Sequence, residues 1–479
     1  MMPYPSSRNA YAFLVALFVV SRLVYYGIGV RFDSILLYCG WQFLEIDLLQ
    51  NHLAQSILNL HSQPPLANLF LGLVLKCFPA GADWVFWLTN MVFGLVMAVA
   101  MFALMQRLNV SPSLSLILTS LFLVSPGTVL YENLLLYTYP TAGLLCLAAL
   151  VLFFMMQTGA ARYGVIFFAL AAVIILTRSL FQIVWPVLAC AVLVRCGRIK
   201  FKSVVLVALV PMLIVLAWQV KNYHRFGVLA TSSWLGLNLT RNTVERLSPE
   251  EIKILVAEGR LSPLAQIPAF SDFEYYRMFI PAPETTGVPA LDRETKGPPC
   301  IGPNLNHIGY IAASKKRLED AFYVICTDPT RFALNVLDAL GIYFKPAGES
   351  LADTGNARRL WFLGYWYRAL GLPEPHGLRP AWPIVAWYGL VLAYGFVVTA
   401  RAVLRQPREI PFHTTIAFMW VTMVYVTVTA NLTDIWENNR VRFMVDPYAW
   451  ILLGVSVNHV LRSVTSTRPH LKGEGGIPT

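Results

Sequence analysis

Charged side chains are scarce in this sequence of 479 residues. Asp, Glu, Lys and Arg together make up 13% of the chain, whereas hydrophobic residues make up 57%. So little charge does not cover the surface of a water-soluble protein of this length, and the apolar runs are long enough to cross a bilayer. The composition therefore predicts an all-α polytopic membrane protein and excludes a soluble enzyme.

Acidic residues are the scarcer sign of charge, with 26 Asp and Glu against 37 Lys and Arg and a net charge of +11. In a membrane protein, such an excess of positive charge retains loops on the cytoplasmic side. No basic stretch is interleaved with aromatic residues, as a groove for nucleic acid requires. We therefore expect membrane lipids as partners and no nucleic acid.

Cysteine is rare as well. The seven cysteines are scattered, and none forms a C-x-x-C pair. This spacing indicates neither a zinc site nor a framework of disulfides. A single bridge between Cys39 and Cys300 stays open as an alternative, because both residues are expected in outer loops.

Long apolar segments are abundant. The first, Ala10–Gly29, has no small-residue cleavage site, so we expect a retained span and not a cleaved signal peptide. We therefore expect a bundle of about 10 transmembrane helices, with about 11–13 as the wider range. The other candidate spans are Trp84–Gln106, Ser113–Leu130, Pro140–Gln157, Tyr163–Thr177, Leu180–Val194, Ser203–Val220, Trp382–Ala400, Pro411–Ala430 and Pro447–Val464.

The apolar helix expected at Leu66–Phe78 decides the orientation of every later span. If it lies along the outer leaflet, 13 basic residues face the inner side and only 4 lie in the short outer loops. That bias follows the positive-inside rule, and a spanning helix would reverse it. The helix is also short for ~30 Å of hydrocarbon. We therefore expect both termini in the cytoplasm and an interfacial helix at Leu66–Phe78.

This topology divides the chain into three parts. Residues 1–220 form a transmembrane module with a catalytic outer loop at 31–79, and residues 221–381 form a small outer domain with outer-leaflet interfacial helices. Residues 382–479 form the last spans and a cytoplasmic tail. An active site outside the cytoplasm is expected where five outer segments converge: the first loop, Tyr131–Pro140, Thr177–Ser179, the outer domain and Trp436–Pro447.

Three carboxylates in the first loop lie at the membrane surface, where unpaired charge is costly and usually functional. Asp33 lies only a few residues past the first span, and it would otherwise cap the next helix or keep the loop hydrated. Glu45 and Asp47 point to different sides of a helix, so at most one is expected to face a common site. A divalent metal held by Asp47 with His52 and His61 stays open, but the H-E-x-x-H spacing is missing and we expect no metal or other cofactor.

Outer arginines allow two interpretations. Arg440 and Arg442 are expected on the outer side, where the positive-inside rule predicts few basic residues. We therefore expect them to bind either anionic lipid headgroups or a substrate phosphate. Arg178 has the same alternatives. In the outer domain, two aromatic-rich amphipathic stretches, Arg331–Phe344 and Leu360–Leu370, are expected to rest on the bilayer.

Several of these motifs together resemble the GT-C membrane glycosyltransferases. They are an aspartate just after the first span, a loop that ends in an H-S-Q-P-P-L helix, a Y-E-N turn before a later span, and an outer domain after about seven spans. More narrowly, the chain resembles the bacterial relatives of protein mannosyltransferases and of the enzymes that add aminoarabinose to lipid A. The resemblance covers residues 10–220 and the E-N-N-R-V-R-F motif before the last span.

The resemblance implies transfer of a sugar from a polyprenyl-phosphate donor to an extracytoplasmic glycan, lipid or protein acceptor, with inversion, in the bacterial cell membrane. It places the general base at Asp33. The family often carries an acidic pair there, but Ser34 follows Asp33, which leaves the second catalytic carboxylate to Glu45 or Asp47. The expected substrate-binding residues are His61, Gln63, Glu132, Tyr137, Arg178, Lys221, Arg225, Glu437, Arg440 and Arg442.

Two other functions fit part of this pattern. A lipid or glycolipid transporter or flippase would explain the spans and the outer cations. Such a protein should hold ionisable pairs at mid-bilayer, and apart from Arg22 the interiors of the spans carry almost none. An assembly factor gives no reason for carboxylates at the mouth of the first span. The sequence therefore favours glycosyl transfer.

Overall fold

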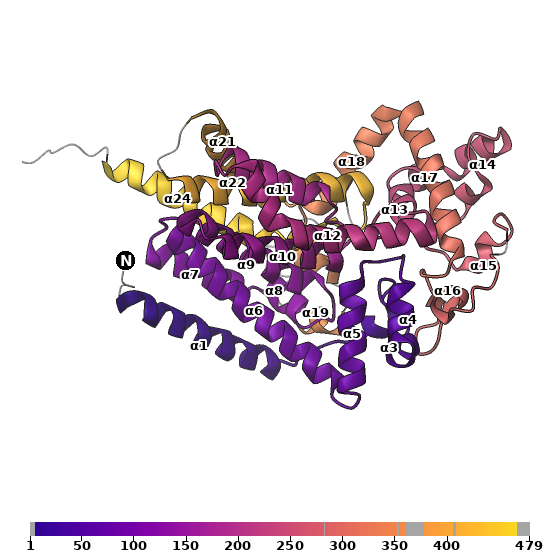
Figure 1. The fold of residues 1–479 in the computed structure, drawn as a ribbon, viewed down its shortest axis with the longest axis horizontal. Coiled ribbons are helices and arrows are strands. Elements are labelled where there is room, and N and C mark those ends of the chain that lie inside the picture. Colours follow the sequence, from indigo (N-terminus) through magenta and orange to yellow (C-terminus); the bar gives the residue numbers. More distant parts are fainter. Residues whose placement is uncertain (1–4, 282, 352–353, 361–377, 406–408, 467–479) are drawn as a thin grey trace, which may run out of the picture.

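The computed structural model describes the chain except residues 1–4, 282, 352–353, 361–377, 406–408 and 467–479. The described chain is mostly helical, and its long helices form a bundle along the long axis of the molecule (Figure 1). They are α1 (Pro5–Gly27), α6 (Ala82–Arg107), α7 (Pro112–Val124), α8 (Pro126–Glu132), α9 (Thr138–Thr158), α10 (Ala161–Thr177), α11 (Val184–Arg195), α12 (Phe201–Phe226), α21 (Trp382–Leu404), α22 (Ile410–Thr433) and α24 (Asp446–Ser466).

Six of the described helices are long and apolar enough to cross a membrane, and the bent pair of α7 and α8 would make a seventh. The chain is thus an all-α, multi-pass membrane protein, as its composition predicts. The helices α10 and α11 are apolar but shorter, and the 12 residues of α11 extend over only about 18 Å. The larger count of about ten spans stays a prediction.

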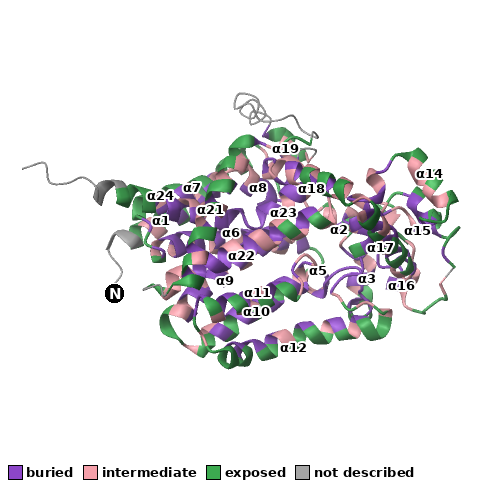
Figure 2. Ribbon diagram, turned by 90° about the horizontal axis from the view of Figure 1, so that it is seen from above, coloured by how far each residue is buried: buried purple, intermediate pink, exposed green. Residues whose placement is uncertain are grey.

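Apolar faces remain exposed on the outer helices of the bundle. The helix α12 lies at its edge, where Leu206, Val210 and Ile214 are each more than half exposed (Figure 2). These residues follow one another at intervals of four and so form one stripe along the helix. A stripe of this kind is unfavourable in water and is expected to face lipid.

The central helices α6 and α9 approach each other closely because small residues lie between them. A Cβ atom on Gly94 of α6 would lie 2.5 Å from the hydroxyl oxygen of Tyr139, which belongs to α9. A Cβ atom on Gly143 of α9 would lie 3.1 Å from the ring of Phe93 on α6. Larger residues at these two positions would push the helices apart.

The first loop folds into four short helices: α2 (Leu36–Cys39), α3 (Ile46–Asn51), α4 (Leu53–Leu58) and α5 (Pro65–Cys77). Proline is the first residue of α5, where its missing N–H breaks no helical hydrogen bond. The axis of α5 runs across the direction of α6 (Figure 1). With 13 residues, α5 is shorter than the helices that are long enough to cross a membrane, and the interfacial position expected for it stays a prediction.

The segment after α12 builds a second body at one end of the bundle, which we call the domain end (Figure 1). Its core contains Trp234, Phe270, Phe273, Tyr276 and Tyr310. Its helices are α13 (Leu235–Arg241), η1 (Val244–Arg246), α14 (Pro249–Ala257), η2 (Pro263–Gln266), α15 (Phe273–Tyr276), α16 (Pro289–Asp292), α17 (Gly309–Thr327) and α18 (Pro329–Tyr343). A two-residue strand β1 (Thr295–Lys296) pairs antiparallel with β2 (Gly302–Pro303). Beyond α18 follow η3 (Ala347–Leu351), α19 (Gly355–Arg359) and, after α22, α23 (Asn438–Phe443).

In this region, the structure moves the expected start of the outer domain and contains one of the two expected amphipathic helices. The helix α12 continues past Val220 to Phe226, and Gly227, with a φ of 69°, ends it. Lys221 therefore lies on α12 and does not begin the outer domain. The helix α18 confirms the one expected at Arg331–Phe344, whereas residues 361–370 of the other amphipathic stretch lie outside the described residues.

The start of α1 and the end of α24 lie together at the opposite end of the bundle, which we call the terminal end (Figure 1). At this end the amide of Asn458 in α24 donates to the carbonyl oxygen of Asn109, just after α6, at 2.9 Å. Both described ends of the chain are thus far from the second body.

Candidate functional site

A cavity of about 800 Å³ lies at the domain end of the bundle. All five segments that the sequence analysis expects to converge contribute residues to its walls. The expected convergence is therefore confirmed. The lining comes from residues 35, 36, 39–42 and 63, from 134, 136 and 137, from 178–180 and 182, from 230, 232, 234, 235, 238, 241 and 270, from 350, 351 and 354, and from 429, 430, 433, 434, 436–438, 440 and 441.

Two arginines face this cavity from different elements. Arg178 directly follows α10, and Arg440 lies in α23. The Nε atom of each is buried and has no hydrogen-bond partner among the described residues. Burial lowers the pKa of Arg178, and the neighbouring charge of Arg440 acts in the same direction. The cavity thus holds two nearby guanidinium groups whose donors are incompletely satisfied.

Two carboxylates line the same cavity. Glu437 is the N-cap residue of α23 and forms an ion pair with Arg440. Asp434 directly follows α22, and its Oδ2 accepts a hydrogen bond from Nη1 of Arg241 at 3.1 Å. The Oδ1 atom of Asp434 accepts from the backbone N–H of Ile435 at 2.7 Å. Burial raises the pKa of the Asp434 carboxyl.

Asp434 and Arg241 are cavity residues that the sequence analysis missed. The signal for Asp434 is present in the sequence, because this carboxylate directly follows an apolar segment, and Asp33 likewise comes only a few residues after one. Arg241 has no such signal. It reaches the cavity only because α13 packs against α22 in the folded chain.

Five of the expected substrate-binding residues line the cavity: Gln63, Tyr137, Arg178, Glu437 and Arg440. The buried Oε1 atom of Gln63 has no hydrogen-bond partner in the described chain. The ring of Tyr137 lies 5.0 Å from the guanidinium carbon of Arg178, within the range of a cation–π contact. These side chains leave donors and acceptors available to a ligand.

An apolar groove of about 360 Å³ adjoins the cavity. Side chains of α5, α6, α9 and α10 line it, including Phe70, Phe86 and Leu144. Leu136 and Tyr137 belong to the walls of both the groove and the charged cavity. A ligand with a charged head and a hydrocarbon tail would therefore find both environments next to each other.

Asp33 lies beside the cavity without lining it. Its backbone bridges to Leu134, and its N–H donates to the carbonyl oxygen of Asn133 at 2.8 Å. Both Ile35 and Leu134 line the cavity. The Oδ1 atom of Asp33 accepts from the backbone N–H of Ile35 at 2.9 Å, whereas Oδ2 has no partner among the described residues. Asp33 thus stabilises a turn through Oδ1 and keeps Oδ2 available at the rim of the cavity.

The expectation that Glu45 and Asp47 point to different sides of a helix is wrong. Both bind the guanidinium group of Arg293, through Oε2 of Glu45 and Oδ2 of Asp47, each at 2.8 Å. The helix α3 begins at Ile46, so Glu45 precedes it and helical spacing does not apply. Neither carboxylate lines the cavity. Hydrogen bonds from Asn51 and Arg293 lower the pKa of Asp47.

His61 is buried between the first loop and the second body. Its Nδ1 lies 2.8 Å from Oγ of Ser233, and its Nε2 lies 3.0 Å from the carbonyl oxygen of Asn306. Burial lowers the pKa of His61 to about 3, so the ring is neutral at pH 7. Because both ring nitrogens are engaged, His61 is not available to a metal. Within the described residues, no group of three or more His, Cys, Asp and Glu side chains is placed to hold one.

Lys221 and Arg225 of α12 also contact the first loop. Lys221 donates to the carbonyl oxygen of Leu60 at 3.0 Å, and Arg225 donates to Oδ1 of Asn59 at 2.7 Å. Neither lines the cavity. Both cations therefore fix the loop against α12.

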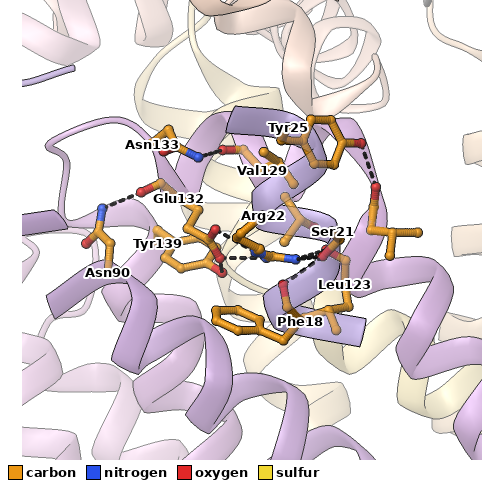
Figure 3. Close-up of polar contacts among 12 residues, drawn as sticks. Phe18, Ser21, Arg22, Tyr25, Asn90, Leu123, Val129, Glu132, Asn133 and Tyr139 are labelled. Atoms are coloured by element: carbon orange, nitrogen blue, oxygen red, sulfur yellow. Dashed lines mark hydrogen bonds and ion pairs between the residues drawn. The ribbon is translucent and has the colours of Figure 1, made fainter. Parts of the chain in front are cut away.

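Glu132, the last residue of α8, is fully buried in an ion pair. Nε and Nη2 of Arg22 on α1 donate to its two carboxylate oxygens at 2.8 and 2.6 Å, and the hydroxyl of Tyr139 donates to Oε2 at 2.6 Å (Figure 3). The pair lies near the domain end of α1 and does not line the cavity. Arg22 therefore has a partner, and Glu132 has little capacity left for a substrate.

This ion pair belongs to the bend between α7 and α8. The two helices meet at 56°, because Pro126 follows the break and supplies no N–H. Nη1 of Arg22 donates to the carbonyl oxygen of Leu123 at 3.0 Å, and the hydroxyl of Tyr25 donates to that of Val124 at 2.8 Å (Figure 3). The helix α1 thus satisfies carbonyl groups that the bend releases.

Glu132→Gln should separate a structural role from substrate binding. We expect this change to lower the free energy of unfolding by about 1.5–3 kcal/mol, the range for hydrogen bonds to charged groups, because Arg22 loses its buried counter-charge. A thermal unfolding scan in detergent measures the loss. Ligand affinity of the folded protein should not change, and a stable variant with impaired ligand binding would contradict the structural role.

Arg442 is separated from Arg440 and from the cavity. Two positions apart on a helix, the side chains point in different directions. Nη1 of Arg442 donates to the carbonyl oxygens of Tyr343 and Lys345 at 2.6 and 2.8 Å, and Nε donates to Oδ1 of Asp446 at 3.0 Å. Arg442 therefore joins α18, α23 and α24.

The bridge between Cys39 and Cys300 is formed, with 5.2 Å between the two Cα atoms. Cys39 lines the cavity, so the disulfide joins one wall of the site to the second body. Nearby, Nζ of Lys296 donates to the carbonyl oxygens of Gly40 and Phe43 at 2.6 and 2.5 Å. The first loop is thus held in place by a covalent bond and by hydrogen bonds.

No family model matches the chain, and no curated protein matches it at a significant level.

Proposed function

We propose that this protein is a membrane glycosyltransferase of the GT-C type, which transfers a sugar from a polyprenyl-phosphate donor to a glycan, lipid or protein acceptor. One observation supports this function most: Arg178 and Arg440 face one cavity beside an apolar groove. The site therefore offers positive charge for a phosphate and a hydrocarbon-lined surface for a lipid tail.

The two guanidinium groups favour an anion between them. Like charges repel strongly where water is scarce, and unpaired buried charges are costly. Among the described residues, Arg178 has no ion-pair partner, and each arginine keeps an unpartnered Nε. Phosphate oxygens accept hydrogen bonds from guanidinium groups in a planar, two-pronged geometry. A phosphate would thus satisfy donors that the protein leaves open.

The groove favours a phosphate that is attached to a lipid. Its lining is almost wholly apolar, and it shares the wall residues Leu136 and Tyr137 with the charged cavity. Water-soluble nucleotide sugars would leave this groove unfilled. The sequence also lacks a Gly-rich phosphate loop of the nucleotide-binding kind, so we propose a lipid-linked donor.

In the proposed reaction, the oxygen of an acceptor hydroxyl attacks the anomeric carbon of the donor sugar. A new C–O bond forms, the bond from the anomeric carbon to the phosphate oxygen breaks, and polyprenyl phosphate leaves with the electron pair. The acceptor proton passes to a carboxylate, while the phosphate needs no proton donor at pH 7. Arg178 and Arg440 would stabilise the negative charge that grows on the phosphate.

We assign the general base to Asp33. Its Oδ2 has no partner among the described residues, and its neighbours Ile35 and Leu134 line the cavity. Asp434 is the competing candidate, because it lines the cavity itself. However, the oxygens of Asp434 already accept hydrogen bonds from the backbone and from Arg241.

Further residues receive separate roles in this proposal. Gln63 and Tyr137 contact the substrates, because both line the cavity. The residues first expected to bind substrate that instead hold the walls in place are His61, Glu132, Lys221, Arg225 and Arg442. Glu45 and Asp47 hold the first loop through Arg293.

Mass spectrometry of envelope glycans and lipids, with and without the gene, tests this function. We expect one glycan, lipid or protein to lose the mass of a single hexose, pentose or amino sugar in the cells that lack the gene. The purified chain in liposomes should restore that mass to the isolated acceptor. Movement of the donor lipid between leaflets without any transfer would instead support the transporter alternative.

We place the domain end of the bundle outside the cytoplasm of a bacterial cell. The 13 to 4 distribution of basic residues supports this orientation. The disulfide of Cys39 and Cys300 supports it independently, because disulfides persist mainly in oxidising compartments. Both termini would then be cytoplasmic, and α5 would lie at the outer leaflet.

Cysteine labelling tests this orientation. In a chain whose free cysteines are replaced by alanine, Ser248→Cys should react with an impermeant thiol reagent added to intact cells, because Ser248 is exposed at the domain end. Ile199→Cys, which lies just before α12 at the terminal end, should react only after the membrane is opened. The reverse result would mean that α5 crosses the membrane.

A further inference from the structure

Glu437 and Arg440 neutralise each other across the first turn of α23. Both line the charged cavity, and they form an ion pair at a spacing of three residues. Their surroundings differ, however. The side chain of Glu437 is 47% exposed, whereas that of Arg440 is 14% exposed and its Nε is buried without a partner. Moving the Glu437 carboxylate into water therefore costs little free energy, whereas the buried Arg440 guanidinium cannot move into water in the same way.

The cavity arginines Arg178 and Arg440 have fewer ion-paired carboxylates than positive charges. Among the described residues, Glu437 is the only carboxylate that forms an ion pair with either Arg178 or Arg440. Asp434 also acts on Arg440, but it forms its ion pair with Arg241. One ion-paired carboxylate is thus shared by Arg178 and Arg440. An exposed ion pair contributes only a little free energy, whereas an unpaired buried charge costs much more. An anion that contacts both arginines would gain more than the carboxylate does.

We propose that Glu437 is a placeholder for the donor phosphate: it holds Arg440 while the site is empty and moves aside when a lipid phosphate binds between Arg440 and Arg178. This role rests on the proposed function and adds a positioning residue to it. Glu437 keeps the arginine side chain in its binding position without a ligand. It also weakens donor binding, because the phosphate has to displace it.

The consequence is unusual for a residue in a binding site. Removal of the Glu437 charge should tighten binding of a phosphate, since no internal anion then competes for Arg440. A residue with a merely structural role would weaken binding when changed. The direction of the effect therefore separates the two roles.

Binding of polyprenyl monophosphate to the full chain in nanodiscs tests the placeholder, with polyprenol as the uncharged control lipid. We expect Glu437→Gln to bind polyprenyl monophosphate about 2- to 5-fold more tightly than the unchanged chain, the effect of a partly exposed ion pair. Polyprenol affinity should be the same in both. Thermal stabilisation by the phosphate lipid should also be larger in the variant.

Two further variants control this experiment. Asp338→Asn also removes one carboxylate from an ion pair, with Arg246 at 2.6 Å, but Asp338 does not line the cavity and its change should leave affinity unaltered. In the double variant Glu437→Gln with Arg440→Gln, the gain in affinity should disappear.

The possible results separate the placeholder from the proposed function. Equal or weaker binding by Glu437→Gln, with clear binding by the unchanged chain, overturns the placeholder and leaves the lipid-phosphate site intact. A similar gain in Asp338→Asn would also overturn it, because general charge would then explain the effect. If neither the unchanged chain nor Glu437→Gln prefers polyprenyl monophosphate over polyprenol, both the placeholder and the lipid-phosphate site are refuted.

Discussion

Arg440→Gln is expected to weaken binding of the polyprenyl-phosphate donor by at least about 30-fold. Truncating one partner of a buried, hydrogen-bonded charge pair usually costs about 2–5 kcal/mol. Arg178→Gln should have an effect of similar size, because both arginines face the same cavity. Arg440→Lys should recover only part of the loss, since an ammonium group lacks the planar, two-pronged donors of arginine.

A surface arginine provides the matched control for these changes. Arg277 is about half exposed and pairs with Glu294 outside the cavity, so Arg277→Gln removes a charge of the same kind at no cost to the site. Its donor affinity should equal that of the unchanged chain. Normal donor binding by folded Arg440→Gln and Arg178→Gln would remove both arginines from the phosphate site. Arg442→Gln is unsuitable as a control, because Arg442 joins three helices.

Asp33→Asn is expected to reduce sugar transfer by roughly 10²–10⁴-fold, the usual contribution of a positioned general base. The amide keeps the size of the side chain and its hydrogen bond to the N–H of Ile35, so expression should be normal. Donor binding should persist, since Asp33 does not contact Arg178 or Arg440 in the structure. Transfer of radiolabelled sugar, measured beside donor affinity, separates the two effects.

Other carboxylates serve as comparisons for Asp33. Glu45→Gln and Asp47→Asn should act more mildly, by loosening the contact between the first loop and Arg293. Asp434→Asn tests the competing base, whose pKa is raised by burial. If Asp33→Asn transfers at a near-normal rate and Asp434→Asn does not, the base is Asp434. If Asp47→Asn alone abolishes transfer, the first loop must rearrange during the reaction.

The first loop illustrates how far sequence patterns reach. The proline pair predicts the start of α5, which the structure confirms, whereas the interfacial position expected for this short apolar helix stays a prediction. Helical spacing fails for Glu45 and Asp47, because α3 begins one residue too late to include Glu45. An error of one residue at a helix end is enough to reverse the expected direction of a side chain.

The arginines of the E-N-N-R-V-R-F motif show a second limit. Their expected position on the outer side predicts anionic partners, either lipid headgroups or a substrate phosphate, but only the orientation of α23 shows which arginine faces the cavity. Arg440 faces the cavity, whereas Arg442 donates to backbone carbonyls and to Asp446. Asp446 follows Arg442 by four residues, but Tyr343 and Lys345 precede it by 99 and 97 residues, and no spacing within the motif reveals these two partners.

The sequence by itself determined the class of the protein and the grouping of its segments. Apolar composition requires a lipid environment, and successive spans of alternating direction bring alternate loops to one end, so convergence of the five outer segments followed from order along the chain. The tertiary structure alone decided which charges stay available. Some neutralising partners lie far apart in sequence, as with Arg22 and Glu132 or Glu45 and Arg293, and only packing brings them within hydrogen-bond distance. Charge patterns identify candidates, but the free energy of pairing in the folded chain determines which of them a ligand can reach.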